Sequence, residues 1–419
     1  HMEVMILSGR FGFGHEMAAN AIREEFERQD RQIEMIQKDL LAYFYPHINR
    51  LIYGGFSLVA ERCHGIYNLV YRLSERMNAE IRQGGSMLYF KFKKMMEEEQ
   101  PDLIVCTHPI CVKAAAFYKA KTGDQVPLVS CITDTSMHMG WVAEQVDTYL
   151  VPTPEMKEYL IRMGTWADVL VTGIPVRQQF LEREERESEE RKMRRLYEMD
   201  MDTGMDLEMN GDGKPSACRR VLVMGGGLGI MPGLEGLLES LHQMPGVHTT
   251  VITGKNQNLY QRWAGRFADV EVLGYVGDIA DLMKQSDLVI TKAGGITMYE
   301  LIHSRVPMFI IHPFLEQEIM NARYASERGI AKVVWGQEED FIQELQDLLM
   351  DPEKLKEIQG CMLRAGKEMM DTGLDEAVRE MSQKADRYRS VFRYSAADRF
   401  PSICQMQTGF GGSGRHYLV

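Results

Sequence analysis

The sequence predicts an α/β protein made of two doubly wound halves, each with a parallel sheet covered by helices. Short apolar runs bounded by turn residues alternate with segments of helical period, which is the pattern of parallel βαβ units. Glycine-rich or polar loops follow many of these runs, where the chain leaves a strand and enters a helix. A charge-dense stretch at 182–220 separates two series of such runs.

The first series begins with an apolar run at Glu3–Ser8, a strand candidate that is followed by a glycine loop. Apolar residues then recur with helical spacing from about His15 to Arg28, which predicts an amphipathic helix. Three more buried strands are expected at Leu103–Thr107, Leu128–Thr133 and Thr148–Val151.

The second series repeats the pattern after the charged stretch. A helix fits between most neighbouring runs, so parallel βαβ units are expected again. The six strand candidates lie at Arg220–Met224, Thr249–Thr253, Val270–Leu273, Leu288–Thr291, Met308–Ile311 and Lys332–Val334.

The length of 419 residues exceeds the size at which chains divide into domains. The stretch 182–220 carries 21 charged residues among 39 and neither Val nor Ile, so it predicts a linker rather than a core. We therefore expect an N-terminal domain over 1–175, this linker, a C-terminal domain over 221–385, and a helix end with a tail over 386–419.

Charge and cysteine content exclude several classes of protein. The net charge of −12 argues against a surface that binds nucleic acid throughout, although a local basic patch is still possible. The seven cysteines include no CxxC pair, so no disulfide or zinc framework is expected and a reducing cytoplasm fits best. No apolar run approaches the roughly 18 residues of a membrane span, and no signal-peptide pattern opens the chain.

The first glycine loop, Ser8-Gly-Arg-Phe-Gly-Phe-Gly-His15, brings bare N–H groups and a helix N-terminus together. It is not GxGxxG, and no acidic residue ends a clear second strand, so a dinucleotide site is not expected. His15 stands beyond the carboxyl end of the strand, where an imidazole can exchange protons with a substrate near neutral pH. A purely structural histidine is the alternative.

Five consecutive strand candidates of the second half end in glycine-rich or polar loops. Ligands of open α/β sheets bind outside the carboxyl ends of the strands, so this edge predicts a binding site. The amides at Gly294–Ile296 suit a diphosphate, and Glu300 either binds ribose hydroxyls or is a solvated helix residue. The loops are Met224–Gly229, Thr253–Asn256, Gly274–Gly277, Thr291–Glu300 and His312–Glu318.

Asp200-Met-Asp202 has the DxD spacing of some metal-dependent glycosyltransferases. No apolar strand precedes it to present the carboxylates, and the spacing and terminal glutamate of an EF-hand are missing. We interpret it as a charged pair in the linker, so no metal site is predicted.

Several motifs occur in a fixed order from about residue 4 to 335, interrupted by the linker. As a set they resemble the diacylglycerol glycosyltransferases, namely plant-type monogalactosyldiacylglycerol synthases and bacterial processive diacylglycerol glucosyltransferases. These are relatives of the N-acetylglucosaminyltransferase that makes lipid II. The motifs are Gly12-Phe-Gly-His15 with Ala18-Ala19, Thr133-Asp134 with His138, Trp141-Val142 and Val146-Asp147, Gly173-Ile-Pro-Val-Arg177, Gly225-Gly-Gly-Leu-Gly229, Gly254-Lys-Asn256, Thr291-Lys-Ala-Gly-Gly-Ile-Thr297 with Glu300, and Gln317-Glu318 with Asn321.

The resemblance implies a GT-B fold, in which two Rossmann-like domains face each other across a cleft. The C-terminal domain would hold a UDP-sugar, UDP-glucose or UDP-galactose, and the N-terminal domain the lipid acceptor, with no metal or other cofactor. The acceptor or membrane side would include Phe13, His138 and Trp141. The donor side would include Gly14, Arg177, Gly226, Gly227, Gly229, Lys255, Asn256, Tyr275, Val276, Gly294, Gly295, Ile296, Thr297, Glu300, Gln317 and Glu318.

Within that donor site, the resemblance places Gly274–Val276 against uracil and Glu300 on the ribose. The amides near Gly294 and Gly295, with the Gly225–Gly229 loop, would surround the diphosphate. Gln317 and Glu318 would hold sugar hydroxyls, and Arg177 would border the nucleotide.

The family reaction is inverting, so it needs a base near the attacking hydroxyl and donors for the leaving diphosphate. We favour His15 as the base, with Asp134 as its rival or partner. Two positions depart from the family pattern. Phe13 replaces a small or amide residue, and Leu228 stands where plant-type members have glutamate.

Residues 41–96 hold eight Lys or Arg and three Glu, a net charge of +5, together with ten aromatic residues. On a helical wheel, Arg50, Arg62, Arg72 and Arg76 fall within an arc of about 120°. Basic faces with aromatic side chains suit an anionic bilayer surface, so peripheral attachment to the inner face of the cell membrane is expected. The alternative is an ordinary pair of packing helices with solvated arginines.

Other functions stay open. The enzyme could act on another lipid or on a small molecule, could be a GT-B sugar-nucleotide epimerase, or could be a non-catalytic UDP-sugar sensor. The sequence does not distinguish glucose from galactose as the transferred sugar.

Overall fold

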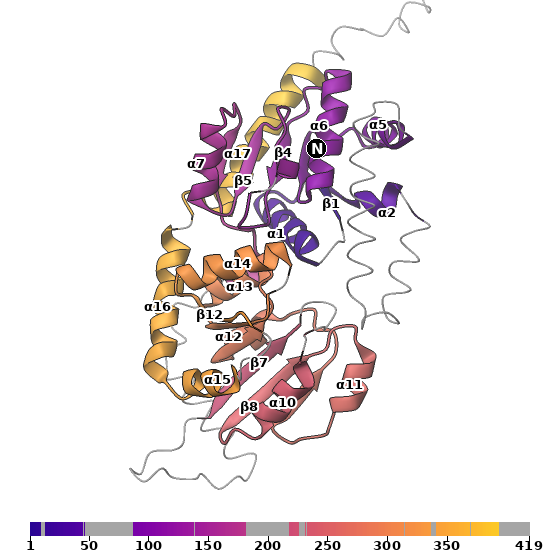
Figure 1. Ribbon diagram of the computed structural model, residues 1–419. Helices are drawn as coiled ribbons and strands as arrows, with labels where there is room; N and C mark the ends of the chain where they lie inside the picture. Colours follow the sequence, from indigo (N-terminus) through magenta and orange to yellow (C-terminus); the bar gives the residue numbers. More distant parts are fainter. Residues whose placement is uncertain are drawn as a thin grey trace, which may run out of the picture.

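The computed structural model describes residues 1–9, 13–44, 46, 87–137, 139–181, 218–225, 231, 233–313, 315–336, 341–368 and 370–393. Two α/β halves, each built on a six-stranded parallel sheet, make up the molecule (Figure 1). The predicted linker as far as residue 217, most of the predicted membrane segment and the tail from 394 lie outside the described residues.

The N-terminal half contains six parallel strands in the order β2-β1-β3-β4-β5-β6. They are β1 (Glu3–Ser8), β2 (Glu34–Asp39), β3 (Leu103–Cys106), β4 (Leu128–Cys131), β5 (Thr148–Val151) and β6 (Asp168–Val171). The helices are α1 (Phe13–Gln29), α2 (Leu40–Phe44), α5 (Met87–Glu99), α6 (Pro109–Thr122), α7 (Pro154–Arg162), α8 (Gln178–Leu181) and the short 3₁₀ helix η2 (Met139–Trp141).

Strands β3, β4 and β5 are buried along their whole length because helices cover both faces of the sheet. Local sequence starts two of these helices. His108 and Thr153 cap the N-termini of α6 and α7 with their side chains, and a proline takes the first helical position in each.

The C-terminal half contains six parallel strands in the order β12-β11-β10-β7-β8-β9. They are β7 (Arg219–Met224), β8 (Val247–Ile252), β9 (Val270–Leu273), β10 (Leu288–Thr291), β11 (Met308–Ile311) and β12 (Ala331–Val334). The helices are α10 (Leu234–His242), α11 (Gln257–Trp263), α12 (Ala280–Lys284), α13 (Gly295–Ser304), α14 (Glu316–Glu327), α15 (Phe341–Leu349) and α16 (Pro352–Glu368).

One face of this sheet packs against α10, α11 and α15, and the other against α12, α13, α14 and α16. Strands β7, β8 and β9 are added toward one side of the sheet, and β10, β11 and β12 toward the other, so the strand order reverses between β7 and β10. Such a reversal opens a crevice at the carboxyl ends of the two strands, where α/β sheets bind ligands. The predicted class of two doubly wound halves is therefore confirmed.

Five predicted strands agree with the structure residue for residue, but β2 and β6 were not predicted. Both lie at the edges of the N-terminal sheet and carry polar residues among their apolar ones, which weakens the apolar signal. The expectation that no acidic residue ends a second strand is wrong, because β2 ends in Asp39. That carboxylate instead accepts the N–H groups of Leu41 and Ala42 at the start of α2.

The last helix, α17 (Leu374–Tyr388), returns to the N-terminal half and is followed by η3 (Arg389–Arg393), as Figure 1 shows. Its apolar face packs beside α1 in the core of the N-terminal sheet. The predicted boundary at 385 therefore does not follow the packing, since the chain crosses back between α16 and α17. At the crossing, the N–H groups of Asp371 and Thr372 donate to the carbonyl of Val171 at 3.0 and 3.2 Å.

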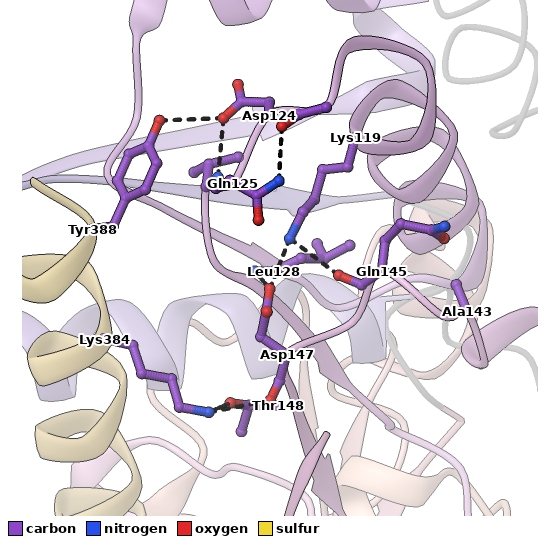
Figure 2. Close-up of polar contacts among 12 residues, drawn as sticks. Lys119, Asp124, Gln125, Leu128, Ala143, Gln145, Asp147, Thr148, Lys384 and Tyr388 are labelled. Carbon is purple, nitrogen blue, oxygen red and sulfur yellow. Dashed lines mark hydrogen bonds and ion pairs between the residues drawn. The ribbon is translucent and has the colours of Figure 1, made fainter. Parts of the chain in front are cut away.

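Polar contacts also attach α17 to this half (Figure 2). Lys384 Nζ donates to Thr148 Oγ1 at 2.6 Å and to the carbonyl of Asp147 at 3.1 Å. One turn later, the hydroxyl of Tyr388 donates to Asp124 Oδ1 at 3.2 Å. The C-terminal helix thus belongs structurally to the N-terminal domain.

Candidate functional site

The carboxyl edges of the two sheets face each other, and side chains join them there. Tyr299 of α13 donates through its hydroxyl to the carbonyl of Pro152, directly after β5, at 2.6 Å. Thr135, in the loop after β4, donates through its N–H group to Asn321 Oδ1 of α14 at 3.3 Å. The edge that carries the glycine-rich loops of the C-terminal half therefore lies against the corresponding edge of the N-terminal half.

Gly295, the first residue of α13, shows how closely the two edges approach. A Cβ at this position would lie 2.6 Å from the carbonyl oxygen of Thr133 and 3.0 Å from Cδ1 of Ile174. Only glycine leaves room for this contact, so the missing side chain lets the N-terminus of α13 reach the other half.

His15 lies in the first turn of α1, with its ring held from several sides. Its Nδ1 atom is 2.9 Å from the hydroxyl oxygen of Thr133. Its carbonyl accepts a hydrogen bond from the hydroxyl of Thr107 at 2.9 Å. The ring of His108 stands nearly perpendicular to it, with a centroid distance of 4.6 Å. The predicted base is thus a fixed group at the carboxyl edge of the N-terminal sheet.

Burial lowers the pKa of His15 to about 4, an effect only partly offset by the main chain of Thr107. The N-terminus of α1 also disfavours a positive charge at this position. The imidazole is therefore neutral at neutral pH and has one nitrogen lone pair available to accept a proton.

His108 is a site residue that the sequence analysis missed. It is buried, and its Nδ1 atom accepts the N–H of Ile110 at 3.2 Å. Its ring lies against Gly9, where a Cβ would come within 3.3 Å of the imidazole. A His-Pro pair directly after a buried strand was the available signal, because it predicts a helix cap at the same sheet edge as His15.

Asp134 is buried beside Trp141, next to Thr133 in the loop after β4. Burial raises the pKa of this carboxyl to about 6, and the indole of Trp141 opposes the shift. The side-chain amide of Gln317, at the start of α14, lies 3.5 Å from Asp134 Oδ2. The structure thus brings together two residues that the sequence assigned to opposite sides of the cleft.

The N-terminus of α13 follows β10 at the point where the strand order reverses. No side chain caps it, since the capping position is Gly294. Amides at an uncapped helix N-terminus can bind a phosphate group. Of the predicted diphosphate-binding amides, those of Gly295 and Ile296 belong to this first turn, together with that of the predicted donor residue Thr297, whereas the N–H of Gly294 donates to the carbonyl of Lys292 at 2.9 Å.

Glu300 lies in the second turn of α13 and is buried. Burial raises the pKa of its carboxyl to about 7, while the charge of Arg177 acts in the opposite direction. Arg177 lies between β6 and α8 and donates to the carbonyl of Gly277 at 3.3 Å. Because Glu300 is buried, the alternative of a solvated helix glutamate is wrong.

The remaining predicted donor residues have different environments. Tyr275 is 61% exposed, and Val276 packs partly against the core beside α12 and α13. Lys255 is exposed, and Asn256 caps α11 by accepting the N–H of Leu259 at 3.0 Å. Glu318 is partly buried near Gln317 in the first turn of α14.

Several predicted residues cannot be placed. The backbone of Phe13 starts α1, but its side chain is not among the described groups. The other predicted residues outside the described part of the chain are Gly226, Gly227, Gly229, Arg50, Arg62, Arg72 and His138.

Asn321 appeared in the sequence motif without a role. It is buried, and its amide donates to the carbonyl of Ala293 at 2.9 Å while its oxygen accepts from Thr135. It therefore ties the loop before α13 to the loop after β4. Among the described residues, no group of three or more His, Cys, Asp or Glu side chains could hold a metal ion.

Two family models match the chain. The model described as monogalactosyldiacylglycerol (MGDG) synthase matches residues 15–176, and the glycosyltransferase family 28 C-terminal domain matches residues 220–372. The first covers most of the N-terminal half with His15 and Asp134, and the second covers the half with the glycine-rich loops.

Curated relatives extend over both halves. The processive diacylglycerol beta-glucosyltransferase of Bacillus licheniformis is 29% identical over 377 residues, 85% of this chain and 88% of its own. The protein of the same name from Bacillus subtilis is 28% identical over 370 residues, 84% of this chain and 88% of its own.

Solved structures resemble the whole fold. The crystal structure of MurG from Acinetobacter baumannii has a TM-score of 0.54 at 14% identity and covers 91% of this chain and 100% of its own. A UDP co-structure of MnaA from S. aureus has a TM-score of 0.53 at 13% identity and covers 94% of this chain and 98% of its own. At these identities the likeness concerns the fold alone, and it confirms the GT-B arrangement.

Proposed function

The chain belongs to the glycosyltransferases that combine a monogalactosyldiacylglycerol synthase domain with a family 28 C-terminal domain, and we propose that it transfers a hexose from a UDP-sugar to diacylglycerol. A glycosyl-diacylglycerol is a second acceptor of the same reaction. The relatives named processive diacylglycerol beta-glucosyltransferase support this acceptor class.

The main observation that supports the proposal is the contact between Thr133 and Gly295. It brings the loop that holds His15 against the uncapped N-terminus of α13. An acceptor hydroxyl beside the imidazole and a diphosphate on the helix amides would then meet at one point between the halves. A transferase needs this juxtaposition, whereas a nucleotide-sugar sensor does not need the histidine.

The donor would lie over the carboxyl edge of the C-terminal sheet. Glu300 would accept hydrogen bonds from the ribose, and the aromatic ring of Tyr275 would lie against uracil. Gln317 and Glu318 would bind the sugar hydroxyls at the N-terminus of α14. The leaving diphosphate would be stabilised by the amides of Gly295–Thr297 and by the helix dipole, with no metal required.

The reaction would be a single displacement with inversion. The acceptor oxygen attacks the anomeric carbon, the bond from that carbon to the UDP oxygen breaks, and UDP leaves. His15 would take the proton of the attacking hydroxyl. Asp134 is the second candidate, because its raised pKa also lets it accept a proton near neutral pH.

Product analysis tests the proposal. The protein is incubated with dioleoylglycerol in mixed micelles and with UDP-glucose or UDP-galactose, and lipids are analysed by mass spectrometry. A β-linked monohexosyl product with release of UDP is the expected result, and the donor that yields it identifies the sugar. Absence of product with both donors would contradict the proposal.

The base is tested separately with His15→Ala and Asp134→Asn at saturating substrates. Turnover at least about a hundredfold slower in His15→Ala is expected, within the usual range for a lost general base. Near-normal turnover in His15→Ala with a large loss in Asp134→Asn would make the carboxylate the base.

A membrane surface is the proposed location of the acceptor. On α5, Met87 and Phe90 are 69% and 62% exposed, and Lys94 follows on the same side of the helix. Apolar side chains next to lysines suit an anionic bilayer surface. None of the described helices meets the length and apolarity required to span a bilayer.

Vesicle sedimentation tests whether the exposed side of α5 with Met87, Phe90 and Lys94 binds a membrane. Binding to vesicles with anionic lipid should exceed binding to zwitterionic ones and should weaken as salt rises. Phe90→Ser should reduce the binding, whereas Phe392→Ser, which changes an exposed aromatic residue on η3, should not. Equal binding to both kinds of vesicle would contradict the attachment.

A further inference from the structure

Thr133 contacts both reacting sides of the proposed site. Its side chain is only 4% exposed, and its hydroxyl oxygen lies 2.9 Å from Nδ1 of His15. Its carbonyl oxygen packs against Gly295 at the start of α13. One residue therefore sets the position of the imidazole and its distance from the amides of the opposite half.

The hydrogen bond to Nδ1 decides which nitrogen of His15 can act as a base. A neutral imidazole carries one proton, and the partner of one nitrogen selects the tautomer. If the hydroxyl oxygen of Thr133 accepts a hydrogen bond from the Nδ1–H group, Nε2 keeps its lone pair. A base at this position needs that tautomer, because Nδ1 is already occupied by the buried hydroxyl.

The ring has little freedom to find another arrangement. His108 stands edge-on to it at 4.6 Å and is itself held by the N–H of Ile110. The carbonyl of His15 is bound by Thr107 on the other side. A β-branched threonine also has few side-chain rotamers, so its hydroxyl direction is well defined.

The loop that carries Thr133 is fixed as well. Two residues later, Thr135 bonds to the buried amide of Asn321, which also holds the carbonyl of Ala293. The segment 133–135 is thus attached to α14 and to the loop before α13. Neither the hydroxyl of Thr133 nor its carbonyl can move without disturbing these contacts.

We propose that Thr133 is a positioning residue for the transfer: its hydroxyl accepts a hydrogen bond from the Nδ1–H group of His15 and so leaves Nε2 as the basic nitrogen, while its main chain sets the distance from that base to the N-terminus of α13. The proposal rests on His15 being the base of the proposed function. It assigns Thr133 no contact with substrate.

Kinetics of Thr133→Val and Thr133→Ser provide the first test, with UDP-glucose or UDP-galactose and dioleoylglycerol in mixed micelles. Valine keeps the shape and removes the hydroxyl, so kcat should fall about 10- to 100-fold with KM for the UDP-sugar within about twofold of normal. Serine restores the hydroxyl and should return kcat to within about threefold. A serine variant as slow as the valine variant would overturn the proposal, as would a valine variant with normal kcat.

Thr249→Val is the matched control. Thr249 is buried in β8, and its hydroxyl has no hydrogen-bond partner among the described residues. Removing this hydroxyl should leave kcat and KM unchanged. A loss of kcat in Thr249→Val equal to that in Thr133→Val would mean that any buried threonine gives the effect, which would overturn the positioning role.

The tautomer is measured without substrate, by nitrogen NMR of protein labelled at the histidine rings. The His15 signals are identified by their loss in His15→Gln. Wild-type protein should show protonated Nδ1, and Thr133→Val should shift the ring toward protonated Nε2. Protonated Nε2 in the wild type would overturn the proposal.

The kinetic assay of His15→Ala and the NMR measurement of the tautomer distinguish a failure of this inference from a failure of the proposed function. Full turnover in His15→Ala would show that the proposed base is wrong, and it would remove the catalytic role of Thr133 with it. Protonated Nε2 in an enzyme that does depend on His15 would overturn only the role of Thr133.

Discussion

At the scale of single residues, three groups of the site have pKa values displaced toward their neutral forms. Burial lowers the pKa of His15 to about 4 and raises those of Asp134 and Glu300 to about 6 and about 7. All three lie at the edge where the two halves meet, which is where binding and proton transfer would occur. Perturbed groups that gather at one place are typical of functional sites.

Donor binding should depend on pH through Glu300. A carboxylate accepts two hydrogen bonds from ribose hydroxyls, but protonation removes part of that capacity. KM for the UDP-sugar should therefore rise as pH falls below about 7, and Glu300→Gln should raise KM roughly tenfold and abolish the dependence. Initial rates between pH 6 and 8.5 measure this.

Glu357→Gln is the control for that change, because Glu357 is an exposed glutamate of α16. It should keep the wild-type KM at every pH. A KM in Glu300→Gln that rises as steeply at low pH as in the wild type would contradict the role of Glu300.

Stability should depend on pH through Asp134. Its pKa is raised on folding, so the folded state is favoured by protonation, and this contribution is lost as pH rises from about 4 through 6. At pH 8 the buried carboxylate costs on the order of 3 kcal/mol, and Asp134→Asn should recover most of it. Urea unfolding at pH 8 and pH 4 should show a gain only at pH 8.

Asp351→Asn should behave in the opposite way. The N–H of Lys354 lowers the pKa of Asp351, so replacing this carboxylate should destabilise the protein slightly at pH 8. An equal gain for Asp134→Asn at both pH values would mean that ionisation of the carboxylate is not the cause.

At the scale of elements, the N-terminus of α13 is the part of the C-terminal half that reaches across. Gly294 leaves it uncapped, and Gly295 lets it approach the carbonyl of Thr133. Glu300 lies on the same helix. The hydroxyl of the neighbouring Tyr299 donates a hydrogen bond to the carbonyl of Pro152 in the other half. A single helix therefore makes contact between the halves and carries the residues proposed to bind the diphosphate and the ribose.

Gly295→Ala tests the importance of this approach. The new Cβ would lie 2.6 Å from a backbone oxygen, so α13 or the Thr133 loop must shift. Such a displacement should lower kcat/KM at least about tenfold, because the base and the diphosphate amides would separate. Steady-state kinetics measure it.

Gly236→Ala is the matched control, since no atom lies within 4 Å of a Cβ at this position in α10. It should keep normal activity and stabilise the helix slightly. Normal kcat/KM in Gly295→Ala would show that the close approach is not needed for the reaction.

At the scale of the whole molecule, α17 makes the two halves interdependent. It follows α16 of the C-terminal half and packs in the N-terminal core. Lys384 bonds to Thr148 and pairs with Asp168, and Lys157 pairs with Asp371 near the crossing. The C-terminal end of the chain therefore contributes to the stability of the domain formed by its beginning.

Lys384→Met should loosen α17. Removing the ammonium leaves Asp168 and Thr148 without this partner, at a cost of about 1 kcal/mol because the pair is partly exposed. Hydrogen exchange should accelerate in α17, β5 and β6 but not in the C-terminal sheet. Arg379→Met, which breaks an exposed pair within α17, should change exchange little. Equal acceleration in both variants would contradict the role of Lys384.

The class of fold and most of the buried strands can be predicted from the amino-acid sequence alone. Runs such as Leu103–Cys106 and Met308–Ile311 are apolar throughout because helices cover both faces of the sheet, so they can be predicted without knowing their neighbours. His15 and Glu300 could be chosen as candidates because loops and helix starts after parallel strands meet at one edge, whereas Asp134 was a candidate only through the resemblance.

Which of these groups contact one another depends on the tertiary structure and could not be predicted from the sequence. The bond between Thr133 and His15, the approach of Gly295 and the link from Asn321 to Thr135 join residues far apart in the chain. The edge strand β2 and the return of α17 were decided in the same way. The local signal of β2 is weak, and the helical spacing of α17 does not indicate which core it joins; the burial that stabilises both comes from partners that only the folded chain brings near.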